Sequence, residues 1–512
     1  MWFTNMSSFE IKNDRIIDLN GIKPDYEVMN FIPKEIMIKY CLIPLYMKEN
    51  SLYIAAYKIE ENQILKDLVF LTKRNLKVFY AAKSQIENLI NQVDKIDDTN
   101  SMLEKLKFQY KNLVKEERVY NSSFIHSEAS PVIRITNTII EQGINYKASD
   151  IHIEPFEEAA RVRYRLDGYL LDDFTLPKEI FSSICSRIKL QANMDIAEKR
   201  LPQDGKIAFK YEGEYKDLRV STLPVLYGEK IVIRILYKSN KLLNLKSLGF
   251  DNLDEELMNN LLKSTHGIIL VTGPTGSGKT TTLYSMLNHV NKSHNNIVTI
   301  EDPVEMALKG INQVNVNNKA GLTFANGLKS LLRQDPDIVM VGEIRDEVTA
   351  EIAVRAAITG HLVISTLHTN DAASSVIRLK DMGIPTYLIA DSLVAVIAQR
   401  LVREICSFCK EPYEPNIEER SNLNLEPNEV LYKGKGCVFC NYTGYKKRII
   451  VYEIMKTSEE LRELITRSKN VDDIRELIKN LGMRSISENC RDKAVKGLTT
   501  YEEYIKLRGN NF

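Results

Sequence analysis

The chain has 512 residues, of which 44% are hydrophobic and 27% charged, so it has the composition of a soluble globular protein and the length of about three or four domains. Its 69 Lys and Arg residues balance 68 Asp and Glu residues, which excludes a global field that would attract nucleic acid or anionic lipid. No apolar run reaches the roughly 18 residues that a membrane span requires, and the first residues lack the layout of a signal peptide, so we expect a cytoplasmic protein.

Residues 1–95 carry no catalytic signature and are interpreted as a small α/β docking domain. A helical segment precedes two strand-like runs, Leu42–Met47 and Leu52–Ala56, and a helix follows a later strand-like run near Leu76–Ala81. Residues 96–127 turn polar and are interpreted as a linker, because nothing in them can bury a face of its own. Such a linker predicts relative motion of the domains that it joins.

Residues 128–240 are predicted to form a second α/β domain, rich in strands and arginine. In the strand VRYRL, apolar residues alternate with Arg163 and Arg165, so both arginines share one face of the strand. Arg219 and Arg234 lie in two further strand-like runs. Arginine on a strand face is most often a solubilising charge. The alternative is a phosphate clamp for an active site in the neighbouring domain.

Residues 246–400 hold the most specific motif of the chain, GPTGSGKT, which fills every fixed position of the pattern G-x-x-x-x-G-K-[ST]. An apolar strand-like run precedes the motif and a helical run follows it, which is the setting of a phosphate-binding P-loop. Glycine lets backbone N–H groups close around phosphate, Lys279 would reach the β- and γ-phosphates, and Thr280 would ligate Mg²⁺. A glycine-rich turn without a ligand is the alternative. The residues predicted to bind the nucleotide are Gly273, Pro274, Thr275, Gly276, Ser277, Gly278, Lys279, Thr280 and Thr281.

Four strand-like runs in this domain alternate with helical stretches, which predicts a largely parallel sheet covered on both faces. Ligands of such sheets bind at the carboxyl ends of the strands. Glu301, Glu343 and His368 each follow one of these runs. A carboxylate can polarise water and hold phosphate through Mg²⁺, so Glu343 and Glu301 are candidate catalytic acids. His368 is a candidate for reading the γ-phosphate or passing a signal to a neighbour, and a structural histidine is the alternative.

Two other parts of the chain are predicted to be helical. Leu388–Val402, the most apolar segment, is interrupted by polar residues and is interpreted as a buried helix rather than a membrane span. Residues 456–512 contain three runs with apolar residues at helical spacing. Thr499 or Thr500 fits the N-cap of the last of these helices.

Four of the seven cysteines form the pairs Cys406-x-x-Cys409 and Cys437-x-x-Cys440, in residues 401–455. Four thiolates satisfy tetrahedral Zn²⁺, and the set leaves no open position, so a structural zinc site is predicted. Unligated thiols that are paired by chance are the alternative. Cysteine pairs of this kind are typical of a reducing compartment.

A series of segments runs almost without gaps from residue 148 to about residue 455 and matches the motifs of one protein family. The segments are ASDIHIEP (148–155), VRYRLDG (162–168), MDIAEKRLPQDGK (194–206), STLPVLYGEKIVIRIL (221–236), VTGPTGSGKTTTLY (271–284), TIEDPVE (299–305), LLRQDPDIVMVGEIRD (331–346), TGHLVISTLHTNDA (359–372), and the tetracysteine segment with TGYKKR (443–448). In these segments the chain resembles the secretion ATPases that drive type IV pilus assembly and type II secretion.

The resemblance implies an α/β fold in which a RecA-like P-loop NTPase domain follows two smaller α/β domains, with a tetracysteine zinc insertion and a helical C-terminus. It implies a homohexameric ring that uses ATP, Mg²⁺ and Zn²⁺. Such a ring binds a platform protein at the inner face of the cell membrane, and its ATP hydrolysis moves pilin subunits. We therefore expect membrane contact through partners.

The resemblance also implies roles for individual residues. It assigns Glu301 and Asp302 to the family's Asp box. It assigns Glu343 to Walker B and His368 to the His box. The arginines that it matches to nucleotide-contacting residues of such rings are Arg163, Arg219 and Arg234, without assigning which of them acts in trans.

Several functions stay open within this reading. The tetracysteine and the N-terminal domain favour an assembly or secretion motor over a retraction motor, and pilus assembly is the first choice. Type II secretion or competence pseudopilus assembly shares every motif above. Residues 1–30 lack the RLG-type motif that opens the cyclic di-GMP module of many assembly ATPases, so platform docking is expected there instead. A nucleic-acid translocase is the remote alternative. It would need a basic lining with stacking aromatic residues, whereas the charge of this chain is nearly balanced.

Overall fold

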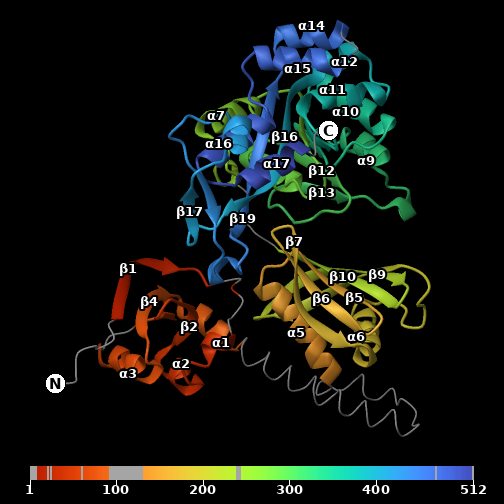
Figure 1. Cartoon of the computed structure of the whole chain (residues 1–512). Helices are drawn as coiled ribbons and strands as arrows, with labels where there is room; N and C mark the ends of the chain where they lie inside the picture. The colour runs from red at the N-terminus through yellow and green to blue at the C-terminus, as the bar shows by residue number, and fades with distance from the viewer. Residues whose placement is uncertain are drawn as a thin grey trace, which may run out of the picture. The chain divides into compact units, whose positions relative to one another are not determined.

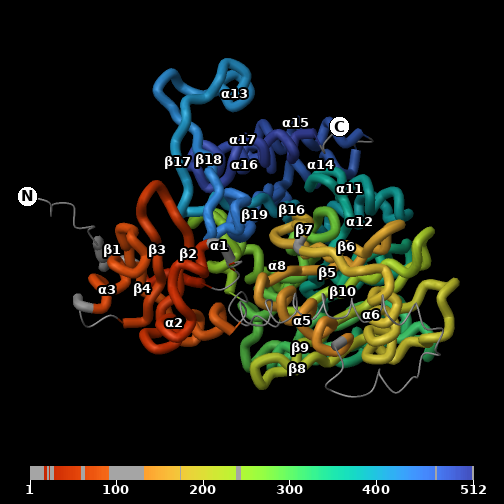
Figure 2. Tube along the Cα trace, turned by 60° about the horizontal axis from the view of Figure 1, so that its bottom comes forward, coloured from red at the N-terminus to blue at the C-terminus, as the bar shows by residue number. Residues whose placement is uncertain are grey.

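The computed structural model describes residues 9–19, 22, 26–58, 62–91, 131–237, 244–467 and 470–509 (Figures 1 and 2). The predicted linker, residues 96–127, lies outside these ranges. The chain divides into two compact units, one of Met1–Tyr237 with Lys435–Gly444, and one of Lys238–Gly434 with Tyr445–Phe512. Within the described ranges, each helix is too short or too polar to cross a membrane.

The N-terminal part of the first unit is built on a small mixed sheet. Its elements are β1 (Phe9–Ile17), α1 (Tyr26–Met29), α2 (Lys34–Tyr40), β2 (Leu42–Lys48), β3 (Ser51–Ala56), α3 (Asn62–Thr72) and β4 (Asn75–Ala81), and residues 83–91 are helical. The strand order is β1-β4-β3-β2, with β2 and β3 antiparallel and β4 parallel to both neighbours. The three strand-like runs and two helices predicted here are present, whereas β1, α1 and α3 were not predicted.

The rest of the first unit is a six-stranded sheet with two helices packed on one face. Its elements are α5 (Pro131–Asn145), β5 (Asp150–Pro155), β6 (Ala159–Leu166), β7 (Tyr169–Pro177), α6 (Lys178–Gln191), β8 (Gln203–Tyr211), β9 (Glu214–Val225) and β10 (Gly228–Leu236). The antiparallel order is β7-β6-β5-β10-β9-β8. In β6, Val162 and Tyr164 enter the core with the helices, so Arg163 and Arg165 share the opposite face as predicted.

The knuckle Lys435–Gly444 belongs to the first unit because it packs on the N-terminal sheet. Phe439 lies edge-on to Tyr46 and to Phe79, with ring centroids 6.1 Å and 6.0 Å away. Phe439 is almost fully buried. The contact is therefore an aromatic one, and edge-to-face packing of this kind is favourable.

The second unit contains a seven-stranded sheet with helices on both faces. Its first elements are η3 (Leu245–Leu248), α7 (Asn252–Leu261), β11 (Gly267–Thr272), α8 (Lys279–Val290), β12 (Ile297–Glu301), β13 (Asn312–Asn315), η4 (Asn318–Ala320), α9 (Phe324–Leu331), β14 (Ile338–Val341), α10 (Glu347–Ile358), β15 (Leu362–Leu367), α11 (Ala372–Asp381) and α12 (Thr386–Ser392). Those that follow are β16 (Leu393–Ile405), β17 (Lys410–Tyr413), α13 (Ile417–Leu423), β18 (Leu431–Gly434) and β19 (Tyr445–Lys456). Between β18 and β19 lies η5 (Val438–Cys440), which belongs to the first unit.

The strand order of this sheet is β13-β12-β14-β15-β11-β16-β19, and only its β16–β19 pair is antiparallel. Alternate residues of β11 enter two different cores: Ile268 packs with α9 to α12, and Ile269 packs with α7 and α8. A strand buried on both faces must be apolar at every position, which is why the sequence shows continuous apolar runs here. The predicted largely parallel sheet, and with it the α/β fold class, is confirmed.

The predicted buried helix Leu388–Val402 is wrong for most of its length. Helix α12 ends at Ser392, and the apolar residues that follow form β16, which is parallel to β11 and antiparallel to β19. Periodicity does not separate a strand buried on both faces from a buried helix. The domain boundary expected at residue 400 therefore falls inside β16, and the tetracysteine segment is an insertion between two paired strands.

The C-terminus is helical, as predicted. Its helices are α14 (Glu459–Arg467), α15 (Val471–Asn480), α16 (Ile486–Val495) and α17 (Tyr501–Gly509). Three of them coincide with the predicted runs, and α16 was not predicted. At the start of α17 the Thr500 hydroxyl accepts a hydrogen bond from the Glu503 N–H at 3.4 Å, which makes Thr500 the N-cap.

Candidate functional site

The P-loop connects the end of β11 to the start of α8 through residues in conformations that favour glycine. The φ angles are +146° at Gly273, +80° at Gly276 and +90° at Gly278. A Cβ at Gly273 would lie 2.3 Å from the carbonyl oxygen of Gln399, so a side chain there would force two strands apart. The loop therefore presents backbone N–H groups at the N-terminus of α8, where an anion is stabilised.

A buried glutamine of β16, which the sequence did not single out as a site residue, braces the P-loop. Gln399 donates from Nε2 to the carbonyl of Ser277 at 2.8 Å and accepts from the Thr282 hydroxyl at 2.9 Å. The P-loop and the first turn of α8 are thus hydrogen-bonded to β16. The signal for this role was present, because Gln399 and the adjacent Arg400 interrupt an otherwise apolar run.

Two polar side chains of the loop have capacity for a ligand. The Lys279 ammonium donates to the carbonyls of Gly273 and Pro274 at 2.8 Å and 3.0 Å, and no carboxylate among the described residues forms an ion pair with it. Burial lowers the pKa of Lys279, while the negative charge of Glu343 acts in the opposite direction. The Ser277 hydroxyl is buried and has no hydrogen-bond partner within the parts of the chain that the structure describes. These features fit a bound phosphate, which supplies oxygen acceptors and negative charge.

Glu343 and His368 come together at the carboxyl ends of two adjacent strands. Glu343 follows β14 and His368 follows β15, and His368 Nε2 lies 3.3 Å from Glu343 Oε2. The other carboxylate oxygen of Glu343 pairs with Arg345 at 2.6 Å. The Glu343 side chain is 14% exposed and that of His368 is 48% exposed. A partly exposed carboxylate beside an imidazole can orient water for attack on phosphorus.

Glu301 lies in more enclosed surroundings, because neutral side chains donate three hydrogen bonds to its carboxylate. Its carboxylate accepts hydrogen bonds from the hydroxyls of Tyr284 at 2.5 Å and Thr299 at 2.6 Å, and from Gln313 Nε2 at 3.0 Å. Glu301 is buried. Burial, and next the hydrogen bond to this carboxylate, raise the pKa of Tyr284. Of the two carboxylates, Glu343 is the more exposed to solvent.

The three predicted arginines lie on one face of the six-stranded sheet but differ in their partners. Arg163 makes two hydrogen bonds to Glu154, at 2.9 Å and 3.0 Å. Arg234 donates to Asp150 at 2.9 Å. Arg219, in β9, forms no ion pair in the described part of the chain and is half-buried. Of the three, Arg219 alone can bind an external anion without first giving up a carboxylate.

Glu154 is the acidic centre of this face. Burial acts to raise the pKa of its carboxyl group, but hydrogen bonds from Arg163 and Lys230 outweigh that effect and lower the pKa to about 2. The Lys230 ammonium lies 2.8 Å from the carboxylate. Carboxylates of the same sheet therefore neutralise much of its arginine charge, which favours a structural role for Arg163 over a phosphate contact.

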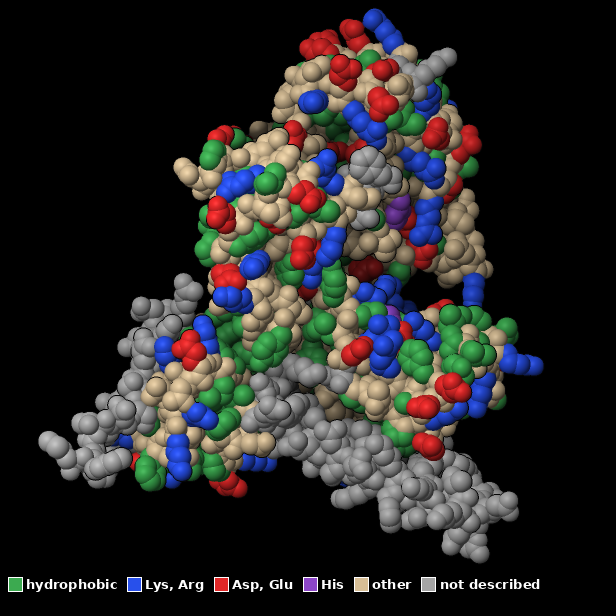
Figure 3. Space-filling view, viewed as in Figure 1, with side chains coloured by type: hydrophobic (Ala, Val, Ile, Leu, Met, Phe, Trp, Pro, Cys, Tyr) green, Lys and Arg blue, Asp and Glu red, His purple; other side chains and the backbone are tan. Residues whose placement is uncertain are grey.

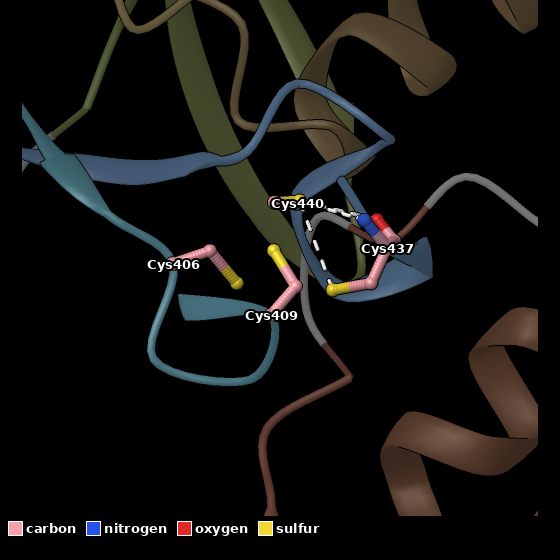
Figure 4. Close-up of side chains that lie close together, drawn as sticks. All are labelled: Cys406, Cys409, Cys437 and Cys440. Carbon is pink, nitrogen blue, oxygen red and sulfur yellow. Dashed lines mark hydrogen bonds between the residues drawn. The ribbon is translucent and has the colours of Figure 1, made fainter. Parts of the chain in front are cut away.

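The four cysteines of the two CxxC pairs converge (Figure 4), as the zinc prediction requires. Their sulfur atoms all lie within 4.8 Å of one another, and Cys437 and Cys440 Sγ are 3.7 Å apart. Four sulfur atoms about 2.3 Å from a tetrahedral zinc are about 3.8 Å from each other. The N–H groups of Cys437 and Gly444 each donate to Cys440 Sγ at 3.2 Å, which stabilises a thiolate. The cluster thus fits Zn²⁺.

A separate groove of about 540 Å³ lies between α14 and α15, where acidic side chains gather at the top of Figure 3. It is remote in sequence from the P-loop and holds none of the predicted site residues. Its lining residues are Glu459, Glu460, Glu463, Leu464, Arg467, Asp473, Glu476, Leu477 and Asn480.

Two family models match the chain and together cover most of it. The model described as "Type II/IV secretion system protein" matches residues 126–506, and the "MshEN domain" model matches residues 14–100. The second match begins inside residues 1–30, where sequence reasoning found no motif.

Two relatives of known function match different shares of this chain. The type IV pilus assembly ATPase PilB of Myxococcus xanthus is 39% identical over 96% of this chain and 88% of its own length. The type II secretion system protein E of Pectobacterium carotovorum is 46% identical over 74% of this chain and 76% of its own length. Among solved structures, the pilus retraction motor PilT with bound ADP has a TM-score of 0.50 and 27% identity, and covers 72% of this chain and 96% of its own. The Legionella pneumophila ATPase DotB shares the fold, with a TM-score of 0.55. It is 20% identical and covers 73% of this chain and 95% of its own.

Proposed function

The chain belongs to the family of type II/IV secretion system proteins, and from this premise we propose that it is an ATPase motor that extends type IV pili. The observation that carries the choice is coverage. The match to the pilus assembly ATPase includes the N-terminal part and spans 96% of the chain, whereas the match to type II secretion protein E spans 74%.

In this proposal the P-loop holds the phosphates of ATP. Lys279 leaves the two carbonyls that it contacts and moves onto the β- and γ-phosphates, and the orphaned Ser277 hydroxyl gains an acceptor. Thr280, the second residue of α8, would hold Mg²⁺, which neutralises charge on the phosphates. Gln399 keeps the loop in place during this exchange.

Hydrolysis requires a carboxylate that orients water in line with the γ-phosphate, and we assign this role to Glu343. Its neighbour His368 contacts that carboxylate and would also contact the γ-phosphate. Glu301 would act as a positioning residue, because it is buried and accepts three hydrogen bonds from neighbouring side chains. We expect Arg219 to stabilise the charge that develops on phosphate, since it has no carboxylate to leave.

The cysteine cluster has a structural role in this proposal. Zn²⁺ bound by Cys406, Cys409, Cys437 and Cys440 would close the insertion between β16 and β19. The metal has no open coordination position there and takes no part in hydrolysis.

We further propose that the motor works as a homohexamer at the inner face of the cell membrane. The N-terminal part would dock on a platform protein of the pilus machine. The balanced charge of the chain gives no reason to expect nucleic acid as a partner.

The test is electron microscopy of surface fibres on cells whose only copy of the protein carries Lys279→Ala. The exposed residue Lys309, in a loop of the same unit, supplies a matched control, Lys309→Ala. We expect fibres on the parent and on the control, and none on cells with a normal amount of folded Lys279→Ala protein. Fibres on the Lys279→Ala cells would contradict the proposal.

A second candidate, a type II secretion or competence motor, is favoured by the 46% identity to protein E. It predicts that Lys279→Ala cells retain fibres but lose exported protein or DNA uptake. A nucleic-acid translocase is the remote third candidate, and it predicts ATP hydrolysis that DNA stimulates and salt suppresses.

A further inference from the structure

The loop that carries His368 leads into Asp371, whose side chain contacts the C-terminal helix α15. Asp371 caps the N-terminus of α11 by accepting from the Ser374 N–H at 2.7 Å. Its other carboxylate oxygen accepts two hydrogen bonds from Arg475 of α15, at 3.1 Å from Nε and 2.6 Å from Nη2. The Asp371 carboxylate therefore caps α11 and also binds Arg475, which lies 104 residues further along the chain.

The next residue of the loop is held by a second C-terminal group. Glu453 of β19 accepts from the Ala372 N–H at 2.6 Å and from the Ile486 N–H at 3.1 Å. It thus joins the N-termini of α11 and α16. Burial raises the pKa of this carboxyl group, and the two N–H donors act against that rise.

The preceding residue has a third anchor. Arg400 of β16 donates from Nη2 to the backbone and side-chain oxygens of Asn370, at 3.3 Å and 3.2 Å. At the other end of the loop, the Thr369 N–H donates to the Thr272 hydroxyl at 3.0 Å. The loop between His368 and α11 is therefore fixed residue by residue, and three of its anchors come from the chain beyond α12.

We propose that Arg475 is a positioning residue for ATP hydrolysis: by holding Asp371 it sets the place of His368 against Glu343. The C-terminal helices thereby control the rate at the nucleotide site. A half-exposed ion pair contributes little to stability, yet a small displacement of a catalytic group costs much in rate. The two effects therefore separate by experiment. The proposal rests on ATP hydrolysis by this chain and not on what the machine assembles.

The test is phosphate release by the purified full chain with Arg475→Gln. We expect kcat to fall by about tenfold to about a hundredfold, with KM for ATP and the thermal unfolding midpoint unchanged, and partial recovery with Arg475→Lys. Two matched controls remove nearby ion pairs without touching Asp371. Arg467→Gln alters an exposed pair within α14, and Asp472→Asn alters the other partner of Arg475. Both controls should keep the parental kcat.

A double-mutant cycle shows whether Arg475 acts through Asp371. Asparagine at position 371 can still cap α11 but carries no charge. The variant with both Asp371→Asn and Arg475→Gln should be no slower than the slower single variant. Additive losses, a parental kcat in Arg475→Gln, or a loss explained by a lower unfolding midpoint would each overturn the link. A parent chain without ATP hydrolysis would instead overturn the proposed function itself.

Discussion

At the scale of single residues, the carboxylate that ends β12 and the one that follows β14 show how much a motif can predict. Sequence reasoning placed Glu301 and Glu343 at strand ends, where both lie. It put Glu343 first, at the place of a Walker B acid, and Glu301 second, but it could not predict their side-chain partners. The hydroxyls of Tyr284 and Thr299 that donate to Glu301 come from α8 and from its own strand. Side-chain partners of this kind depend on packing and not on the local pattern.

Arg219 and Arg163 give a prediction that separates a phosphate contact from a structural charge. Arg219→Ala should lower kcat by about 10³-fold or more, the effect of removing an arginine that stabilises transferring phosphate, and leave the unfolding midpoint near that of the parent. Arg163→Ala should lower stability by about 1–3 kcal/mol, since it removes a charged hydrogen-bond partner of the buried Glu154, which keeps Lys230 and Arg161. Steady-state kinetics and thermal unfolding on both variants check this. Equal kinetic losses without destabilisation would contradict the assignment.

The same carboxylate predicts how stability depends on pH. The folded-state pKa of Glu154 is about 2, below its ordinary value of about 4.3, so its contribution is present above about pH 4.3 and lost as pH falls towards 2. Urea unfolding of the parent and of Glu154→Gln at a series of pH values tests this. We expect the variant to be less stable near pH 6, and the difference to shrink below pH 4. A constant difference would show that the charge is not responsible.

At the scale of elements, β16 is the clearest failure of local reasoning. The residues of this strand face two cores, so they are apolar without a period of two, and a helix was the natural reading. The same strand supplies Gln399 and Arg400, which support the P-loop and the His368 loop. The interrupting polar residues were therefore the useful signal, although they were read as breaks in a membrane span.

The insertion between β16 and β19 leads to a prediction about metal content. We expect about one zinc per chain in the purified protein, the number that four-thiolate ligation requires. Cys437→Ser should lose it, and its unfolding midpoint should fall, since metal binding contributes to folding. Cys490→Ser, at a buried cysteine of α16 outside the cluster, is the matched control for metal content. Elemental analysis that finds full zinc in Cys437→Ser would refute the site.

At the scale of the whole molecule, the sequence predicted the fold class because each level of the pattern agreed with the next. The P-loop, the alternating strands and helices, and the cysteine pairs all follow local rules. Contacts between segments far apart in the chain were beyond those rules. Arg475 with Asp371 and Glu453 with Ala372 belong to this class, because nothing near Arg475 in the sequence names its partner.

The central claim is that this chain hydrolyses ATP with Glu343 as the group that orients water. Phosphate release by purified Glu343→Gln, with the affinity for a fluorescent ATP analogue measured on the same sample, tests it most directly. We predict binding close to that of the parent and a turnover lower by about 10²- to 10⁴-fold, the contribution of a positioned general base. Parental turnover in a variant that binds nucleotide normally would contradict the account.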